Sequence, residues 1–169
     1  MDVRAAATGD IAAMQEIERQ AGELFRSVGM PSIADDPPFP ADELAAFVDD
    51  GRAWVIDGPA GEPVAYALVE QLDDSAHIAQ VSVHPDHGRQ RLGRALVDQV
   101  EAWARAKGLG ALTLTTFRDV PWNGPYYERL GFTALPADQW GPDLRATVAS
   151  ERHLEASGPR VVLRRAIAP

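Results

Sequence analysis

Residues 81–96 read VSVHPDHGRQRLGRAL, and this stretch decides the fold. Apolar residues up to Val83 predict the end of a strand, His84-Pro85 predicts a turn, and Leu92 begins the apolar face of an amphipathic helix. Main-chain N–H groups at the start of a helix have no intrahelical partners, and the helix dipole adds positive potential there. The stretch therefore predicts a loop that can wrap a pyrophosphate.

The loop itself contains residue types that suit an anion. Gly88 and Gly93 let the backbone approach a ligand closely, while Arg89, Arg91 and Arg94 add positive charge. The alternative is an ordinary strand-to-helix turn with solvated arginines, because an isolated glycine-rich turn is weak evidence for a site.

Two other phosphate-binding motifs are excluded by the sequence. A P-loop needs Gly-Lys-Ser/Thr, which does not follow the strand. A dinucleotide-binding fingerprint needs three spaced glycines, and only Gly93 could serve; three strands of antiparallel appearance also precede the loop.

The part of the chain before the loop predicts helices and then a meander. An apolar stripe and short turns bounded by Gly, Pro and Asp define these elements. We expect a strand at 3–7, a helix at 11–28, an acidic loop at 31–40, a helix at 42–50, and strands at 53–57, 63–72 and 77–83.

Helices and strands alternate after the loop. We expect a helix at 92–107, a strand at 111–117, a helix at 123–130, a strand at 132–135, a helix at 142–154 and a strand at 160–166. The helix at 92–107 should cross over between two parallel strands. The order predicts an α/β (α+β) fold, and no linker or repeat divides the single domain expected over residues 1–169.

Composition limits the class of protein. The chain has 169 residues, 46% of them hydrophobic, which suffices for a core without disulfides or structural metal. It has no cysteine, so thiol chemistry and cysteine-ligated metals are excluded. The formal charge of −9 disfavours nucleic acid as a partner and suits a cationic substrate such as a protonated amine, although solubility alone could explain it.

The compartment is expected from what the sequence lacks. It shows no charged-then-apolar leader and no apolar run of the roughly 18–20 residues that span a bilayer. We therefore expect a soluble cytoplasmic protein with no membrane partner.

The loop resembles a family signature. Val83-His84-Pro85-Asp86 followed by Arg91-Leu92-Gly93-Arg94-Ala95-Leu96 is similar to the acetyl-CoA signature of GNAT acetyltransferases, Gln/Arg-x-x-Gly-x-Gly/Ala. Gly88 falls on its first position, Arg91 on its first glycine and Gly93 on its last position. An arginine at the first glycine position must adopt a conformation that a Cβ permits.

A second signature lies further along the chain. Residues 123–132, NGPYYERLGF, resemble the family's Asn followed by an aromatic-Tyr-x-x-x-Gly-Phe run, and the order of elements matches from Val3 to Ala166. The resemblance implies a mixed, mostly antiparallel central sheet flanked by helices. It further implies direct transfer of an acetyl group from acetyl-CoA to a primary amine of a small molecule or protein, in a ternary complex, without metal. Dimers are common in the family.

The resemblance also assigns site residues. The strands at 77–83 and 111–117 would splay apart to admit the pantetheine arm, which pairs with the main chain of Val81, Ser82 and Val83, and an N–H near Val81 would face the oxyanion. The cofactor-binding residues it implies in the loop are Gly88, Arg89, Gln90, Arg91, Leu92, Gly93 and Arg94.

The second signature supplies an acid. Tyr127 matches the general acid that protonates the departing thiolate, and its alternative role is core packing. Tyr126 is expected to pack. Asn123 would bond the cofactor or, as an N-cap, the backbone.

The proton acceptor is missing from its usual place. The strand at 76–83 carries no carboxylate, and Ala79 stands where relatives often have Glu. Three options stay open: a histidine accepts the proton, an acidic side chain does so through water, or the amine arrives neutral. The side chains concerned are His77, His84, Glu70, Asp73, Asp35 and Asp36, and each could equally be solvated or structural.

Two further hypotheses accompany the enzyme. One is an acetyl-CoA-binding module of the same fold with weak or no catalysis, acting as a sensor or interaction partner. The other is an anion-binding α/β domain unrelated to coenzyme A. On the acceptor side, apolar residues could line a wall, although such spacings are more often core; these residues are Phe25, Met30, Phe39 and Phe47.

Overall fold

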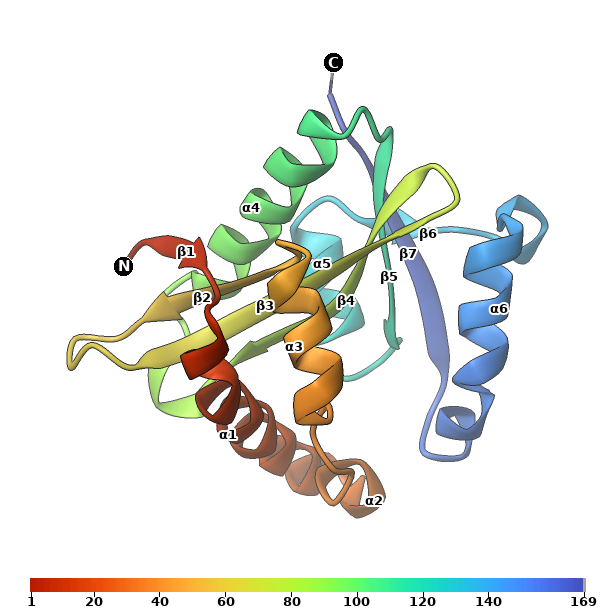
Figure 1. Ribbon diagram of the computed structural model, residues 1–169. Helices are drawn as coiled ribbons and strands as arrows, with labels where there is room; N and C mark the ends of the chain where they lie inside the picture. The colour runs from red at the N-terminus through yellow and green to blue at the C-terminus, as the bar shows by residue number, and fades with distance from the viewer. Residues whose placement is uncertain (169) are drawn as a thin grey trace. The chain divides into compact units, whose positions relative to one another are not determined.

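The computed structural model describes residues 1–168, which form seven strands and six α-helices (Figure 1). They group into two units: residues 1–69 with 79–100, and residues 70–78 with the chain from 101 onward. Three elements run from one unit into the other: β3 (Pro63–Leu72), β4 (Ser75–Val83) and α4 (Leu92–Ala106).

The first unit holds the N-terminal strands and helices. Antiparallel pairing joins β1 to β2, with Arg4 opposite Val55, and β2 to β3, with Val55 opposite Tyr66. The unit contains β1 (Val3–Ala5), α1 (Ile11–Gly22), α2 (Pro31–Ala34), α3 (Ala41–Asp49), β2 (Ala53–Asp57) and β3 as far as Val69.

One face of β2 and β3 is covered by α1 and α3 (Figure 1). Helix α1 presents Met14 and Ile17 to this face, and α3 presents Leu44. From the strands, Val55 and Tyr66 complete the cluster, and both are fully buried. Apolar side chains recur every three or four residues along the helices and every second residue along the strands. Each element therefore has an apolar face, and packing these faces together excludes water.

The second unit is built on β5 (Ala111–Phe117). The start of β4 pairs with it in parallel, from Ser75 opposite Ala111 to His77 opposite Thr113. The whole of β7 (Arg160–Ala166) pairs with it antiparallel, and β6 (Thr133–Ala134) pairs with β7. Helices α5 (Gly124–Arg129) and α6 (Pro142–Ser150) complete the unit.

The mixed, mostly antiparallel sheet and the parallel crossover predicted from the sequence are confirmed. Strands 53–57, 63–72, 111–117 and 160–166 have the predicted bounds. Strand β1 ends at Ala5 rather than residue 7, and β4 begins at Ser75 rather than residue 77.

The helices differ more from expectation. The first α-helix ends at Gly22 and continues as a 3₁₀ turn over Glu23–Val28. The expected loop at 31–40 contains α2, because Pro31 occupies the first helical turn, where its missing N–H costs nothing. The last helix ends at Ser150, and a 3₁₀ turn follows at Arg152–Ala156.

Helix α6 is held by a carboxylate from the β3–β4 turn. Asp73 accepts hydrogen bonds from the N–H groups of Asp143, at 3.0 Å, and Leu144, at 3.1 Å. Asp143 accepts the Asp73 N–H in return, at 2.9 Å. This reciprocal cap satisfies N–H groups that the helix start leaves open.

Within residues 1–168, no helix is long and apolar enough to cross a membrane.

Gly124 at the start of α5 gives the first testable prediction. A Cβ there would lie 2.3 Å from the carbonyl oxygen of Arg118, a backbone atom that cannot swing away. We expect Gly124→Ala to cost about 1–3 kcal/mol, which lowers Tm by roughly 3–10 °C in thermal unfolding. Gly110→Ala is the control, because a Cβ there meets nothing within 4 Å. Equal shifts in the two variants would contradict the close approach.

Candidate functional site

The turn after β4 is built by its own side chains. His84 caps the short 3₁₀ turn Pro85–His87, its Nδ1 accepting the Asp86 N–H at 3.2 Å. The Gly88 N–H then bonds the Pro85 carbonyl at 3.2 Å, which ends the turn. His84 is therefore engaged in turn geometry, one of the two roles expected for it.

The loop that follows has an uncommon backbone. Arg89 and Arg91 have φ of 63° and 60°, in the left-handed region that glycine adopts freely and other residues enter at a cost of order 1–3 kcal/mol. Arg91 occupies the first glycine position of the signature described above. It keeps the backbone shape that a glycine would give, in the small left-handed region that a Cβ permits.

Helix α4 begins with open amides. The first hydrogen bond from the helix back to the loop runs from the Ala95 N–H to the Arg91 carbonyl, at 3.1 Å. The N–H groups of residues 92–94 precede it, so helix geometry leaves them without an intrahelical acceptor. Leu92 and Gly93 are buried, which anchors this end of α4.

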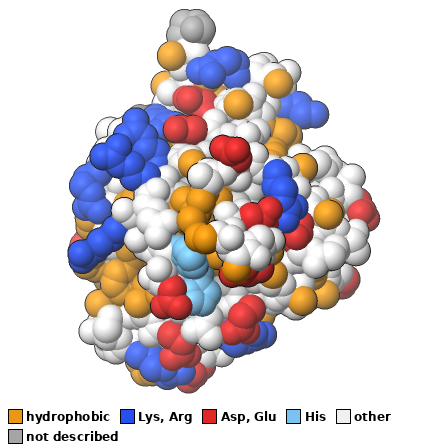
Figure 2. Space-filling model, turned by 90° about the vertical axis from the view of Figure 1, so that its left-hand side faces the viewer, with side chains coloured by type: hydrophobic (Ala, Val, Ile, Leu, Met, Phe, Trp, Pro, Cys, Tyr) orange, Lys and Arg blue, Asp and Glu red, His pale blue; other side chains and the backbone are white. Residues whose placement is uncertain are grey.

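Positive charge surrounds these amides. The side chains of Arg89, Arg91 and Arg94 are exposed, and among the described residues none of the three forms an ion pair. The chain is acidic overall, yet basic side chains do gather: Figure 2 shows Lys and Arg along one border of the face drawn there. Exposed arginines without carboxylate partners and open amides within one short loop are features that suit an anion.

Tyr127 lies on α5 with a free hydroxyl. The residue is buried, and its ring meets Tyr126 and Phe132 edge to face at 5.2 and 5.7 Å. Burial raises the pKa of the phenol above its usual value, so it stays protonated at neutral pH. No other described residue hydrogen-bonds the hydroxyl. The ring therefore packs as expected of an aromatic core residue, while the O–H can donate to an incoming group.

Asn123 precedes α5 without capping it by its side chain. Its carbonyl accepts the Tyr127 N–H at 3.1 Å, but its side chain makes no cap hydrogen bond. Of the two roles expected, N-cap or cofactor contact, the first is therefore not observed for the side chain.

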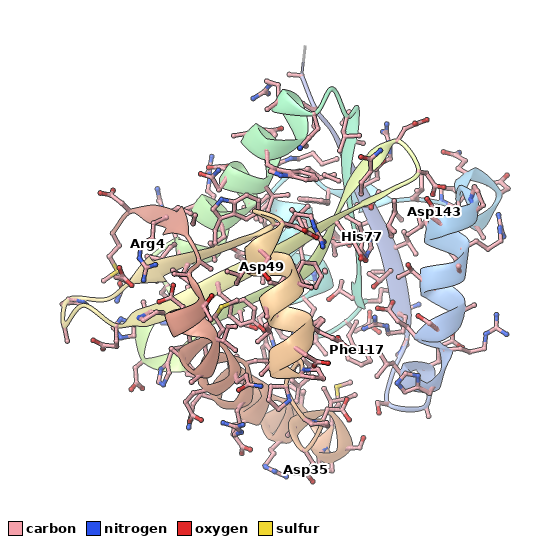
Figure 3. All side chains as sticks on the ribbon, viewed as in Figure 1. Arg4, Asp35, Asp49, His77, Phe117 and Asp143 are labelled. Carbon is pink, nitrogen blue, oxygen red and sulfur yellow. The ribbon has the colours of Figure 1, made fainter. Side chains whose placement is uncertain are left out.

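His77 is a neutral side chain in the second unit. It is 2% exposed, and its Nδ1 lies 2.9 Å from the Thr113 hydroxyl oxygen on β5 (Figure 3 labels the histidine). Burial lowers the pKa of this imidazole to about 4. A base with so low a pKa is poorly matched to deprotonating an amine near neutrality.

Acidic side chains expected as alternatives are also engaged. The Asp73 carboxylate caps α6, as described above. Asp35 pairs with Arg26, so that part of the acidic segment is neutralised locally. Both carboxylates therefore have structural partners of their own.

The structure reveals one carboxylate that sequence reasoning missed. Glu18 of α1 is half-buried, and its Oε2 accepts hydrogen bonds from the Phe39 N–H at 2.8 Å and the Tyr66 hydroxyl at 3.2 Å. Burial raises the pKa of this carboxyl above its usual value, against the lowering effect of those hydrogen bonds and of Arg19. The signal was present in the sequence, because Glu18 lies four residues after Met14, on the apolar stripe of its helix.

A family comparison matches the sequence over most of this region. A sequence model of the Acetyltransferase (GNAT) family matches residues 12–132, more than half of the chain. The chain belongs to the GNAT acetyltransferase family.

Solved structures share the GNAT fold. N-acetylglutamate synthase from Neisseria gonorrhoeae, complexed with coenzyme A and N-acetyl-glutamate, has a TM-score of 0.75 at 16% identity; the match covers 99% of this chain and 35% of the synthase chain. Rv2747 from Mycobacterium tuberculosis, complexed with CoA and NLQ, also has a TM-score of 0.75, at 18% identity, covering 99% of this chain and 100% of that one.

A third neighbour is a protein-modifying enzyme. The ribosomal-protein-S18-alanine N-acetyltransferase from Escherichia coli has a TM-score of 0.68 at 19% identity, and the match covers 99% of this chain and 94% of that one. At these identities the neighbours establish the fold of this GNAT chain and leave its acceptor open.

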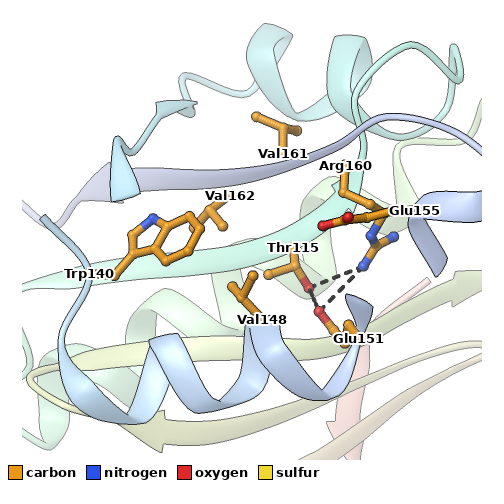
Figure 4. Close-up of a pocket in the computed structure, with 8 residues that line it drawn as sticks. All are labelled: Thr115, Trp140, Val148, Glu151, Glu155, Arg160, Val161 and Val162. Atoms are coloured by element: carbon orange, nitrogen blue, oxygen red, sulfur yellow. Dashed lines mark hydrogen bonds and ion pairs between the residues drawn. The ribbon is translucent and has the colours of Figure 1, made fainter. Parts of the chain in front are cut away.

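This GNAT chain has a small cavity between α6 and strands β5 and β7 (Figure 4). Its volume is about 90 Å³. Inside it, the Thr115 hydroxyl donates to Glu151 Oε1 at 2.6 Å, and Arg160 lies 3.4 Å from both atoms. The remaining walls are Trp140, Val148, Glu155, Val161 and Val162. Because Thr115, Glu151 and Arg160 bond to one another, we interpret the cavity as part of the packing under α6. Among residues 1–168, no group of three His, Asp or Glu side chains could hold a metal ion.

The neutral state of His77 predicts an acid sensitivity. Its folded pKa of about 4 lies below the ordinary 6.5, so the unfolded chain binds the proton more readily between these values. Stability should therefore fall as the pH drops from about 6.5 to 4, by on the order of 2–3 kcal/mol for this residue. Urea unfolding of His77→Gln at several pH values should lack that component. His153→Gln, at an exposed histidine, should keep it, and identical pH dependences in all three proteins would contradict the assignment.

Proposed function

We propose that this GNAT protein is an N-acetyltransferase that transfers the acetyl group of acetyl-CoA directly to a primary amine, within a single catalytic domain over residues 1–169. The observation that carries the proposal is the start of α4. There, Arg89 and Arg91 have a left-handed backbone conformation, and the loop that contains them has open amides and arginines without ion pairs, which suit a pyrophosphate. In coenzyme A that anion is the diphosphate that links the adenosine 3′-phosphate to the pantetheine arm.

In this proposal the cofactor is held largely by main-chain groups. The pyrophosphate contacts Gly88, Arg89, Gln90, Arg91, Leu92, Gly93 and Arg94. The pantetheine arm pairs with Val81, Ser82 and Val83 as an added strand would. The N–H near Val81 stabilises the oxygen that becomes negative when the amine attacks the thioester carbonyl. Asn123 is proposed to contact the cofactor through its side chain, which forms no cap hydrogen bond at the start of α5.

Tyr127 supplies the proton for the leaving group. As the tetrahedral intermediate collapses, the carbon–sulfur bond breaks and the sulfur leaves with the electron pair. Its proton comes from the Tyr127 hydroxyl, which is protonated at neutral pH and has no other described hydrogen-bond partner. No metal takes part in the proposed reaction.

The acceptor is a primary amine of a small molecule or of a protein. The neighbours named above include an N-acetylglutamate synthase solved with N-acetyl-glutamate and a ribosomal-protein-S18-alanine N-acetyltransferase. The charge of −9 favours a cationic acceptor by long-range attraction.

A second candidate is a coenzyme A-binding module with weak catalysis. It is favoured by Ala79, since β4 carries no carboxylate to take the amine proton. Two measurements separate the candidates. Calorimetry should show coenzyme A binding in both cases, while thiol release from acetyl-CoA should occur only for the enzyme. The amines to supply are L-glutamate, n-butylamine, spermidine and a short peptide with a free amino terminus.

The left-handed backbone at Arg91 predicts unequal effects of two matched substitutions. Arg91→Val and Arg94→Val remove the same charge, but only Arg91 has a positive φ, which a β-branched residue tolerates poorly. We expect Arg91→Val to weaken coenzyme A binding at least tenfold more than Arg94→Val does, as measured by calorimetry. Arg91→Gly should stay close to the binding of Arg94→Val. If all three variants lost affinity equally, charge rather than backbone shape would hold the cofactor.

Removing one hydroxyl tests the proposed acid. Tyr127→Phe keeps the edge-to-face contacts and should leave coenzyme A affinity within about twofold. It should lower the rate of thiol release on the order of 100-fold, the usual contribution of a positioned acid. Tyr126→Phe is the matched control on the neighbouring ring. A Tyr127→Phe protein with the unaltered rate would remove Tyr127 from the mechanism.

A further inference from the structure

A polar network crosses the apolar face between α1 and the strands of the first unit. Gln80 Nε2 donates to Ser82 Oγ at 2.7 Å, Ser82 is hydrogen-bonded to the Tyr66 hydroxyl, and Tyr66 donates to Glu18 at 3.2 Å. Tyr66 is fully buried and Ser82 is 4% exposed. Polar groups are costly in such surroundings unless each is paired, so this network is a specific feature of the core.

The network ends at β4 beside the proposed acetyl site. Gln80 and Ser82 flank Val81, whose main chain is proposed to face the thioester carbonyl. All of these residues, and Glu18 itself, belong to the first unit. A carboxylate on α1 is thereby connected to the point on β4 where the amine would attack, although β4 has no carboxylate of its own.

Glu18 has room to take a proton. Both of its hydrogen bonds fall on Oε2, from the Phe39 N–H and the Tyr66 hydroxyl. Among the described residues, Oε1 has no hydrogen-bond partner. One oxygen is thus fixed by two donors while the other is available, which is the arrangement expected of a positioned acceptor.

We propose that Glu18 is the general base that takes the proton from the acceptor ammonium. This inference rests on the proposed function. Glu18 Oε1 accepts one proton from R–NH₃⁺, which leaves a neutral amine and a carboxylic acid. The nitrogen lone pair then forms the bond to the acetyl carbon, and the carbon–sulfur bond breaks with its electrons going to sulfur. The thiolate takes its proton from Tyr127, which recovers one from the amide nitrogen through water, and Glu18 releases its proton to solvent.

The electrostatics around Glu18 suit this role. Burial raises the pKa of Glu18 toward the operating pH, where a base combines the right charge state with the ability to hold a proton. Of the groups that face it, Tyr66 on β3 is neutral, because burial raises the pKa of that phenol as well. Arg19 on α1 is the one charged side chain among the described residues that acts on Glu18, and it favours the carboxylate.

The test compares wild type with Glu18→Gln, Glu18→Asp and the control Glu16→Gln. Glu16→Gln removes the same charge from the exposed side of the same helix. Activity is followed by thiol release with the best amine of the panel above, from pH 5 to 9. We expect wild-type kcat/KM to rise with pH through the raised pKa of Glu18. Glu18→Gln should lose that rise and fall about 100-fold, while Glu18→Asp keeps the rise at a lower rate and Glu16→Gln matches wild type.

Thermal unfolding supplies a readout that needs no acceptor. Because the folded pKa of Glu18 is raised, the folded state binds its proton more readily than the unfolded chain, and the residue costs stability as the pH rises through that value. Glu18→Gln should therefore have a Tm equal to or above wild type at pH 7.5, with the difference shrinking toward pH 4. If the hydrogen bonds of Glu18 served only to stabilise the fold, Glu18→Gln would instead have a lower Tm than wild type at every pH.

The outcomes separate the two proposals. If calorimetry shows no coenzyme A binding, the proposed function fails first. If coenzyme A binds but no amine is acetylated by the wild type, the proposed transferase activity fails and the binding module remains. If an amine is acetylated and Glu18→Gln retains the wild-type pH profile, Glu18 is not the base. A lower Tm of Glu18→Gln at pH 7.5, with activity lost only in proportion to folded protein, would also overturn the inference.

Discussion

Parallel pairing of β4 with β5 is the constraint on which the candidate site depends. Parallel neighbours cannot be joined by a tight turn, so the chain must leave β4 and return through a crossover, here α4. The crossover forces a helix to begin nine residues after the strand ends at Val83. A helix start always leaves amides open, and the fold therefore presents unpaired N–H groups near the end of β4, where the pyrophosphate is proposed to bind.

The first unit shows how polar groups are stabilised inside an apolar face. Tyr66, Ser82 and Glu18 would each be costly alone, but hydrogen bonds join them into one network that the Phe39 N–H completes. The network leaves one carboxylate oxygen open, so full burial of the charge is avoided. His77 is stabilised differently: it is buried with a single hydroxyl partner, and its imidazole stays neutral.

The sequence predicted the strands more accurately than the helix ends and the polar contacts. Strand bounds follow from alternation and from Gly, Pro and Asp at the turns, which are local signals; 111–117 and 160–166 matched for that reason. The cap of α6 joins Asp73 to Asp143, seventy residues apart, and no local pattern announces it. Glu18 lies on the same stripe of α1 as Met14, but helical periodicity is a signal carried by apolar residues and does not by itself assign a role to a carboxylate.

Arg91 shows why a departure from a signature can leave its physical role intact. The signature has glycine there because the loop needs a left-handed residue, and the chain supplies that conformation with arginine. The cost is steric, of order 1–3 kcal/mol, but the arginine also narrows the conformations open to the unfolded loop and adds a charge where an anion is proposed to bind. Glycine would relieve the strain and lose both contributions. In this chain the position therefore keeps a positive φ with an unbranched side chain in place of glycine, and a β-branched residue there would be strained further.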